Sequence, residues 1–280
     1  MFKSKIFYIY VLIVIVAINF ALYFFWFNLN IRMNTEEITV KNPELNSSLS
    51  LKIALIGDIH LPDNEKYYKK LSTLLDNVNQ EEPDIIIFAG DYTSSPKKVA
   101  SMEKHRSRIV ELLTKDQLNK KIFVLGNYES WSNPDTWIES FQEKDATLLE
   151  NEIYQFKFNE KTICIRGFGD YYTKKYTYID FPDECNDKVK FSVTHDPAGA
   201  FDPKVKGLVL AAHTHCGQVR LPFYGALWVP TSAPKEATCG VYKDNQRTVF
   251  TTSGAGTTIF PVRVGTQSEW DMLRVNFQRK

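Results

Sequence analysis

Seven acidic, amide and imidazole side chains in this sequence have the types and spacing of metal ligands. Each lies at or just beyond the end of a short apolar run: Asp58, His60, Asp91, Asn127, His195, His213 and His215. Mixed carboxylate, carboxamide and imidazole ligands suit borderline divalent ions. Because seven ligands are too many for one ion, we expect two ions that share a carboxylate. Mn²⁺ is our first choice, with Fe²⁺ or Zn²⁺ as alternatives.

A pair of such ions indicates a particular reaction. Two ions roughly 3.5 to 4 Å apart can hold both the attacking and the leaving oxygen of a phosphoryl displacement, and they lower the pKa of a bound water. The sequence therefore predicts hydrolysis of a phosphoester or pyrophosphate bond through a metal-bound hydroxide. The expected partner is a phosphorylated small molecule, or a lipid-linked substrate if the domain is tethered to a membrane.

Three short apolar runs in the first half of the chain are expected to be buried strands that position these side chains. They cover residues 51–57, 84–90 and 121–126, and glycine precedes Asp58, Asp91 and Asn127. Apolar residues at helical spacing separate the strands: Tyr67, Leu71, Leu74, Leu75 and Val78, then Val99, Met102, Ile109, Val110 and Leu113. This β-α-β-α-β order predicts an α/β fold, in which ligands bind at the carboxyl ends of the strands.

In the second half of the chain the sequence predicts mainly strands. They fall at residues 153–158, 162–167, 190–194, 208–212, 248–252 and 272–277. His195 follows one of them, and His213 and His215 follow another. Five strand ends therefore converge on one site.

The motifs around these ligands resemble, in order and spacing, those of calcineurin-like metallophosphoesterases. They read Asp58-Ile59-His60, Gly90-Asp91, Gly126-Asn127-Tyr128-Glu129, Thr194-His195 and His213-Thr214-His215-Cys216-Gly217-Gln218. The resemblance extends from Leu51 to the C-terminus. It is greatest for a bacterial membrane-anchored subgroup that includes enzymes acting on lipid-linked phosphates such as UDP-diacylglucosamine. Residues 218–225, 253–256 and 261–263 resemble loops of that subgroup.

The resemblance implies a four-layer α/β/β/α sandwich and a division of the ligands between two ions. Asp58, His60, Asp91 and His215 would hold the first ion. The second would be held by Asp91, Asn127, His195 and His213, with Asp91 as the bridge.

Tyr128 is the main departure from the family pattern. The family has a histidine here that contacts the phosphate and assists the leaving group, so Asn127 and Tyr128 are the residues expected to act in catalysis. Loss of this histidine also raises the alternative of a degenerate member that binds ligands with little catalysis. All seven ligands are retained, which favours an enzyme. Glu129 is expected to orient a neighbouring residue.

The N-terminal segment predicts a membrane anchor. Ile6 to Phe27 is about 22 residues without a charge, enough to cross the bilayer as a helix. A buried core helix and a cleaved signal peptide are the alternatives. We therefore assign residues 1–27 to a cytoplasmic tip and transmembrane helix, 28–50 to a linker and 51–280 to the metallophosphoesterase domain. Lys3 and Lys5 place the N-terminus in the cytoplasm and the domain outside it.

Several other features remain open or lack a role. The net charge of +1 does not indicate nucleic-acid binding. The four cysteines have no metal-binding spacing, and their redox state stays open. Cys216 is interpreted as a small buried residue and His105 as a solvated one. Tyr171, Tyr172, Tyr176 and Tyr178 either shape a substrate or membrane surface or pack a loop; Trp131, Phe223 and Tyr224 are stronger candidates for such a surface.

Overall fold

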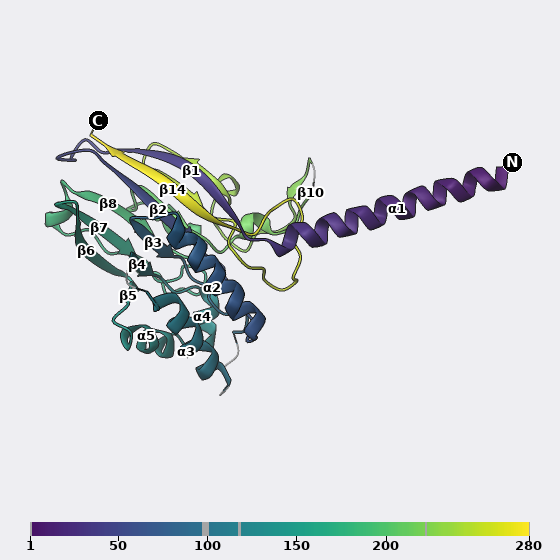
Figure 1. Ribbon diagram of the computed structural model, residues 1–280. Coiled ribbons are helices and arrows are strands. Elements are labelled where there is room, and N and C mark those ends of the chain that lie inside the picture. Colours follow the sequence, from purple (N-terminus) through teal and green to yellow (C-terminus); the bar gives the residue numbers. More distant parts are fainter. Residues whose placement is uncertain (1, 97–100, 117–118, 222, 280) are drawn as a thin grey trace.

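Two six-stranded sheets form the body of the molecule (Figure 1). The computed structural model describes residues 2–96, 101–116, 119–221 and 223–279. The first sheet has the order β1 (Arg32–Lys41), β14 (Glu269–Gln278), β2 (Leu49–Ile56), β3 (Ile85–Phe88), β4 (Lys120–Phe123) and β5 (Thr147–Leu148). The second has the order β12 (Gly240–Lys243), β13 (Arg247–Thr251), β9 (Gly207–Ala211), β8 (Val189–Val193), β7 (Lys161–Gly167) and β6 (Glu152–Phe158).

The predicted β-α-β-α-β unit is confirmed in the first sheet. Strands β2, β3 and β4 are parallel, and α2 (Glu65–Gln80) and α3 (Ser101–Thr114) connect them. On α2 the buried tyrosine is Tyr68 and not the expected Tyr67. The hydroxyl of Tyr68 donates a hydrogen bond to Asp63 and contacts the ring of His105. Val99, expected on the next helix, lies outside the described residues.

The alternation of side chains along the strands divides the core into two layers. Ile53 and Leu55 point between the two sheets, where they join inward-facing residues of β8 and β9. Ala54 and Ile56 point to the other face, which α2, α3 and α5 (Pro134–Gln142) cover. Since strand side chains alternate with a period of two, one buried strand serves both layers. This explains why its sequence is apolar throughout.

The outer face of the second sheet differs from the expected four-layer sandwich. Val209 and Val249 pack there against Phe168 and Ala200, the latter from the 3-10 helix η2 (Pro197–Phe201). Within the described residues, no α-helix covers this face. The structure therefore has three regular layers, helices, sheet and sheet, with loops and 3-10 turns in place of the second helical layer.

Part of the predicted linker belongs to the first sheet. Strand β1 lies within residues 28–50 and pairs with β14 along its whole length, from Arg32 with Glu269 to Lys41 with Gln278. Ile38 and Val40 enter the core between the sheets. The linker prediction is therefore wrong over this strand, because its partner lies more than 200 residues away and leaves no local signal.

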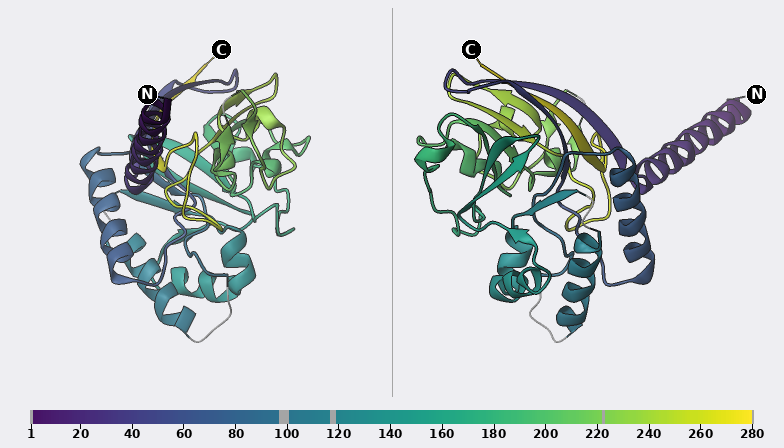
Figure 2. Two further views of the ribbon diagram at one scale, coloured as in Figure 1. Left: turned by 90° about the vertical axis from the view of Figure 1, so that its right-hand side faces the viewer. Right: turned by 60° about the vertical axis from the view of Figure 1, so that its left-hand side comes forward.

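The helix α1 (Phe2–Leu29) extends away from the two sheets (Figures 1 and 2). It covers the segment where we expect a membrane span. Among the residues that the structure describes, no helix meets the length and apolarity needed to cross a membrane. A helix is therefore confirmed here, and the transmembrane prediction is not.

Two disulfides answer the question that the cysteine spacing left open. Cys164 pairs with Cys185, and Cys216 pairs with Cys239. Cys216 therefore forms a disulfide, whereas the sequence was interpreted as giving it only a packing role. His105 is also reassigned, because it is buried and its Nε2 lies 2.9 Å from the carbonyl oxygen of Leu61.

The disulfide remote from the ligand-bearing strand ends makes a testable contribution to stability. Cys164 and Cys185 are 21 residues apart and fully buried. Replacing both with alanine should lower the free energy of unfolding by roughly 3 kcal/mol, because the unfolded chain gains conformational freedom. Urea unfolding of the double variant and the parent protein measures this difference. Equal midpoints and slopes would contradict the cross-link.

Candidate metal centre

The seven predicted ligands lie together at one edge of the two sheets. Asp58 and His60 follow β2, Asp91 follows β3, and Asn127 opens the short helix α4 (Asn127–Ser132) after β4. His195 follows β8, and His213 and His215 follow β9. All seven side chains are buried. The sheet edges therefore bring together residues that span 158 positions of sequence, from 58 to 215.

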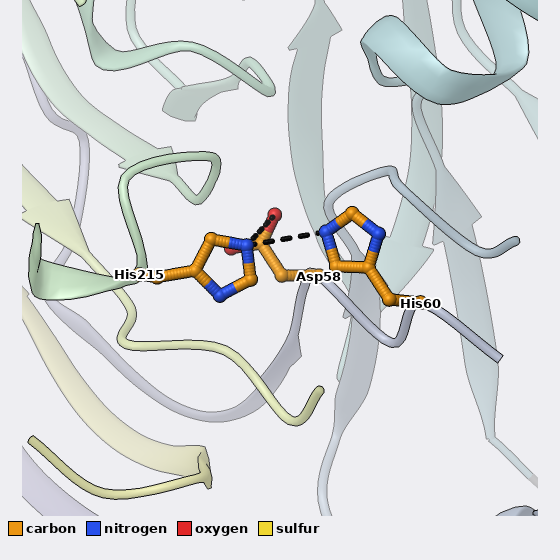
Figure 3. Close-up of side chains that lie close together, drawn as sticks. All are labelled: Asp58, His60 and His215. Atoms are coloured by element: carbon orange, nitrogen blue, oxygen red, sulfur yellow. Dashed lines mark hydrogen bonds and ion pairs between the residues drawn. The ribbon is translucent and has the colours of Figure 1, made fainter. Parts of the chain in front are cut away.

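The ligand atoms form two groups that could each hold an ion. One contains Asp58, His60 and His215 (Figure 3). The other contains Asp91, His195 and His213. Within each group, the candidate atoms lie within 4.8 Å of one another. The two groups contain six of the seven candidate ligands, and Asp91 belongs to the second group only. Asn127 is the seventh candidate, and its Oδ1 lies 3.1 Å from Nε2 of His195.

Asp91 belongs to the second group and also faces the first. Its Oδ2 is 3.4 Å from Nε2 of His60 in one group and 3.4 Å from Nε2 of His195 in the other. Its second oxygen, Oδ1, accepts a hydrogen bond of 2.9 Å from the backbone N–H of Tyr128. One oxygen is thus fixed by the backbone, and the other faces both groups.

Hydrogen bonds orient two of the histidines. His195 Nδ1 lies 2.7 Å from the carbonyl oxygen of Ala89, which accepts its proton and leaves Nε2 facing Asp91. His213 has the opposite arrangement: Nε2 lies 2.7 Å from the carbonyl oxygen of Pro230, and Nδ1 faces His195 Nε2 at 3.2 Å. Such partners fix the tautomer of a ligating imidazole.

The backbone around the ligands is strained. Five of the seven have a positive φ between 42° and 70°: Asp58, His60, Asp91, His213 and His215. This region is uncommon for non-glycine residues and clusters at functional sites. At Gly126 a Cβ would lie 2.3 Å from Oδ1 of Asp91, so only glycine permits this approach of the two strand ends.

Burial and neighbouring charges set the protonation of the centre. Burial raises the pKa of Asp58 to about 7 and lowers the pKa of His60 to about 4. Burial also lowers the pKa of His213 and of His215. Although burial opposes it, the charge of His195 lowers the pKa of Asp91 to about 2. Although burial opposes it, the charge of Asp91 raises the pKa of His195 well above its ordinary value. Neutral imidazoles and ionised carboxylates are the forms that bind metals, so a metal bound at His195 would displace a proton.

The donor set fits divalent ions. Asp58 Oδ2 is fully buried and has no hydrogen-bond partner among the described residues, although an isolated carboxylate oxygen is costly to bury. Nε2 of His60 and Nε2 of His215 face each other at 3.1 Å, beside this carboxylate. A cation among these atoms would satisfy all three groups.

Glu129 holds the loop that carries Asp91. Its buried carboxylate accepts hydrogen bonds from the backbone N–H groups of Asp91, Tyr92 and Gly126, at 2.8, 2.8 and 3.0 Å. It thereby links the ends of β3 and β4. Its role is positioning, as the sequence indicated.

Aromatic rings border the ligands on the solvent side. The ring of Tyr128 lies 4.5 Å from that of His60, and that of Tyr172 lies 4.9 Å from that of His213. Trp131 lies between the two tyrosines, with ring distances of 5.5 and 6.1 Å. The sequence left Tyr172 open between a surface role and loop packing, and the structure places its ring against that of His213.

Arg263 is a buried residue of the site whose role the sequence did not reveal. Its guanidinium lies 3.0 Å from Nδ1 of His215. It also donates hydrogen bonds to the carbonyl oxygens of Ser253, Gly254 and Gly256, at 2.7, 3.0 and 2.6 Å. These carbonyls belong to the loop beside Asp58, so Arg263 holds a ligand and a loop together. The sequence showed only that residues 261–263 resemble a family loop.

Replacing Arg263 with lysine should destabilise the protein. An ammonium group cannot reach the carbonyls that the planar guanidinium spans, and each buried acceptor left without a partner costs roughly 1–3 kcal/mol. We expect a loss of roughly 3 kcal/mol or more in the free energy of unfolding, measured by urea unfolding. Arg220→Lys, at a half-buried arginine with one hydrogen bond to the carbonyl of Cys216, is a matched control. Equal effects of the two changes would count against this role of Arg263.

Comparison with known proteins agrees with a metal centre that hydrolyses phosphoesters. Residues 51–217 match the family model described as calcineurin-like phosphoesterase. The chain is 28% identical over 244 residues to the uncharacterized metallophosphoesterase YkuE of Bacillus subtilis, covering 82% of this chain and 81% of that protein. It is 25% identical over 253 residues to a transmembrane protein with metallophosphoesterase domain from Danio rerio, covering 83% of this chain but 55% of that protein.

A solved structure with similarity to the chain is the NAD nucleotidase of Haemophilus influenzae. The TM-score is 0.48 and the identity 12%, with 75% of this chain and 46% of that chain covered. The family match includes every candidate ligand, from Asp58 to His215. Site geometry and sequence similarity therefore indicate the same reaction, and the chain belongs to the calcineurin-like phosphoesterase family of phosphoester hydrolases.

Proposed function

We propose that this protein is a two-metal phosphoesterase in which Asp91 bridges the ions. The observation that carries the proposal is the position of Asp91 Oδ2, 3.4 Å from a histidine of each ligand group. Asp58, His60 and His215 would complete the ligands of the first ion. Asn127, His195 and His213 would complete those of the second, with Mn²⁺ as the proposed metal and Fe²⁺ or Zn²⁺ as alternatives.

The chain and the ions have separate tasks. Bound divalent ions neutralise charge on the phosphate and lower the pKa of a water. The chain fixes where this happens: Glu129 and the N–H of Tyr128 hold Asp91, and carbonyls hold the rings of His195 and His213. Asn127 Oδ1 lies 3.1 Å from His195 Nε2 and completes that end of the centre. Burial excludes bulk water and strengthens each of these interactions.

Tyr128 is proposed to face the leaving group. Its ring packs on His60, and its hydroxyl lies 2.6 Å from Thr258 Oγ1 at the border of the centre. Burial raises the pKa of Tyr128 above its ordinary value. A phenol with a raised pKa donates a hydrogen bond but is a poor proton donor near neutral pH. Esters and pyrophosphates whose leaving group needs little protonation are therefore the preferred substrates.

A ligand-binding role without catalysis is the alternative function. It is motivated by tyrosine at the position of the family's catalytic histidine. Retention of all seven ligands, five of them in a strained backbone conformation, supports catalysis instead.

We also propose a lipid-linked or envelope phosphate as the substrate and a membrane location for the protein, with the domain outside the cytoplasm. Exposed apolar side chains on α1 from Phe7 to Ile18 support attachment to a membrane. The pairing of all four cysteines supports an oxidising compartment. The Danio rerio relative is named as a transmembrane protein. Resemblance to the subgroup acting on UDP-diacylglucosamine makes a lipid-linked pyrophosphate one candidate.

The bridging role can be tested with Asp91→Asn. The amide lacks the charge needed to hold two cations, so metal content should fall below two ions per chain. Hydrolysis of a nitrophenyl phosphodiester should fall by roughly 100-fold or more, the cost of removing a key electrostatic contact. Asp271→Asn is the matched control. Asp271 is buried like Asp91, but it lies on β14, outside the site, and accepts a hydrogen bond from Asn34. Full activity with two ions in Asp91→Asn would refute the bridge.

Tyr128→His tests the leaving-group assignment. Imidazole has an ordinary pKa near 6.5, and general acid catalysis is worth roughly 10²- to 10⁴-fold. The variant should raise turnover of alkyl phosphoesters more than that of nitrophenyl esters, with unchanged metal content. Tyr128→Phe, which removes only the hydroxyl, should slow alkyl esters and leave nitrophenyl esters nearly unchanged. Equal effects on both substrate classes would show that this side chain only packs.

A further inference from the structure

Two neighbouring loops expose large apolar side chains beside the metal centre. We call this surface the apolar rim. Its members lie in residues 221–228 and 259–262: Leu221, Phe223, Tyr224, Leu227, Trp228, Ile259, Phe260 and Val262. Phe223 is fully exposed, and Ile259 and Phe260 are 73% and 70% exposed. Large apolar side chains exposed together on neighbouring loops indicate an interaction site.

A backbone bridge and side-chain hydrogen bonds hold the two loops together. Val219 and Val264 form a parallel bridge, and the side-chain amide of Gln218 donates to the carbonyl oxygens of Thr258 and Phe260, both at 3.0 Å. The relative position of the loops is therefore fixed by the fold. The rim is one surface and not two independent loop tips.

The rim also borders the metal centre directly. Its first loop begins shortly after His215, and the second loop is joined to the centre at both ends. Thr258 contacts the hydroxyl of Tyr128, and Arg263 contacts the ring of His215. A membrane or molecule that contacts the rim would therefore lie beside the position proposed for the substrate.

The tip of each loop combines two unfavourable features in one residue. Phe223 has φ +65° and Ile259 has φ +60°. A left-handed backbone is unfavourable for a bulky residue and is an outlier for a β-branched one. Packing inside the protein does not offset the unfavourable backbone energy, because both side chains are exposed. The fold thus presents an apolar group outward at each tip, where a contact outside the chain would compensate.

The composition of the rim favours a lipid bilayer over a protein partner. The sequence has no charged residue from Leu221 to Pro234 or from Gly254 to Val262. Tyr224 and Trp228 are of the types enriched where membranes meet water. The exposed apolar helix α1 leaves the domain on the side that carries these loops (Figures 1 and 2). Arg32, just after this helix, donates a 2.9 Å hydrogen bond to the carbonyl of Ser268, which follows the second loop.

We propose that the apolar rim rests in the interfacial layer of a lipid bilayer and turns the metal centre toward phosphoesters held at the membrane surface. The inference rests on the proposed function for the identity of the substrate, but contact with lipid stands independently of catalysis. The helix α1 brings the domain to the membrane, and the rim sets its orientation there.

Trp228 provides a direct reporter of this contact. The full-length protein is bound to phosphatidylcholine vesicles whose acyl chains carry bromine, which quenches nearby tryptophan fluorescence. The Trp228 contribution is the difference between the parent protein and Trp228→Phe. We expect bromine to quench it. In the control Trp228→Phe/Tyr154→Trp, the reporter lies on β6, far from α1 (Figure 1), and should escape quenching. An unquenched Trp228, or equal quenching at both positions, would overturn the proposal.

A second variant tests the loop tips. Phe223→Asn/Ile259→Asn removes both apolar groups and suits the left-handed backbone, which asparagine tolerates. The melting temperature should stay the same or rise. Quenching of Trp228 on vesicles should be lost, and hydrolysis of a soluble nitrophenyl phosphodiester should be unchanged. Retained quenching would refute the rim. Absence of hydrolysis in both proteins, with quenching as predicted, would refute the proposed function and leave the rim in place.

Discussion

The burial of two carboxylates, Asp58 and Asp91, is the constraint around which the site is built. An ionised carboxylate inside a protein is stable only when cations or hydrogen bonds compensate its charge. Around Asp91 the fold supplies the N–H of Tyr128 on one oxygen and histidines of both ligand groups on the other. Asp58 receives an N–H from His213 on one oxygen only. The imbalance that remains is the electrostatic reason for divalent ions in this centre.

The two-sheet architecture follows from the same requirement. Asp58 and Asp91 end strands of the first sheet, and His195 and His213 follow strands of the second. Neither sheet alone could surround the carboxylates. The apolar core between the sheets fixes their separation, and glycine at position 126 lets strand ends meet closely enough for the ligands to converge. Packing energy thereby offsets the strain stored at the ligands, a general property of active sites.

Prediction from sequence succeeded where the signal was local. Asp58 and Asp91 were recognisable because each follows an apolar run and a glycine. Strand β1 was missed because its partner β14 lies at the other end of the chain. His105 looked solvated because its neighbours in sequence are charged, yet its ring is buried against Leu61 and Tyr68. No role for Arg263 was evident from the sequence, and that of Tyr172 was left open, because the residues that they contact, His215 and His213, are distant from them in sequence.

Electron paramagnetic resonance of the manganese-loaded protein can show whether one carboxylate joins two ions. Ions bridged by Asp91 at the roughly 3.5 to 4 Å typical of two-metal sites must couple magnetically. We expect two Mn²⁺ per chain and the multiline spectrum of an exchange-coupled pair. One ion per chain, or two ions with the six-line spectrum of isolated Mn²⁺, would contradict it.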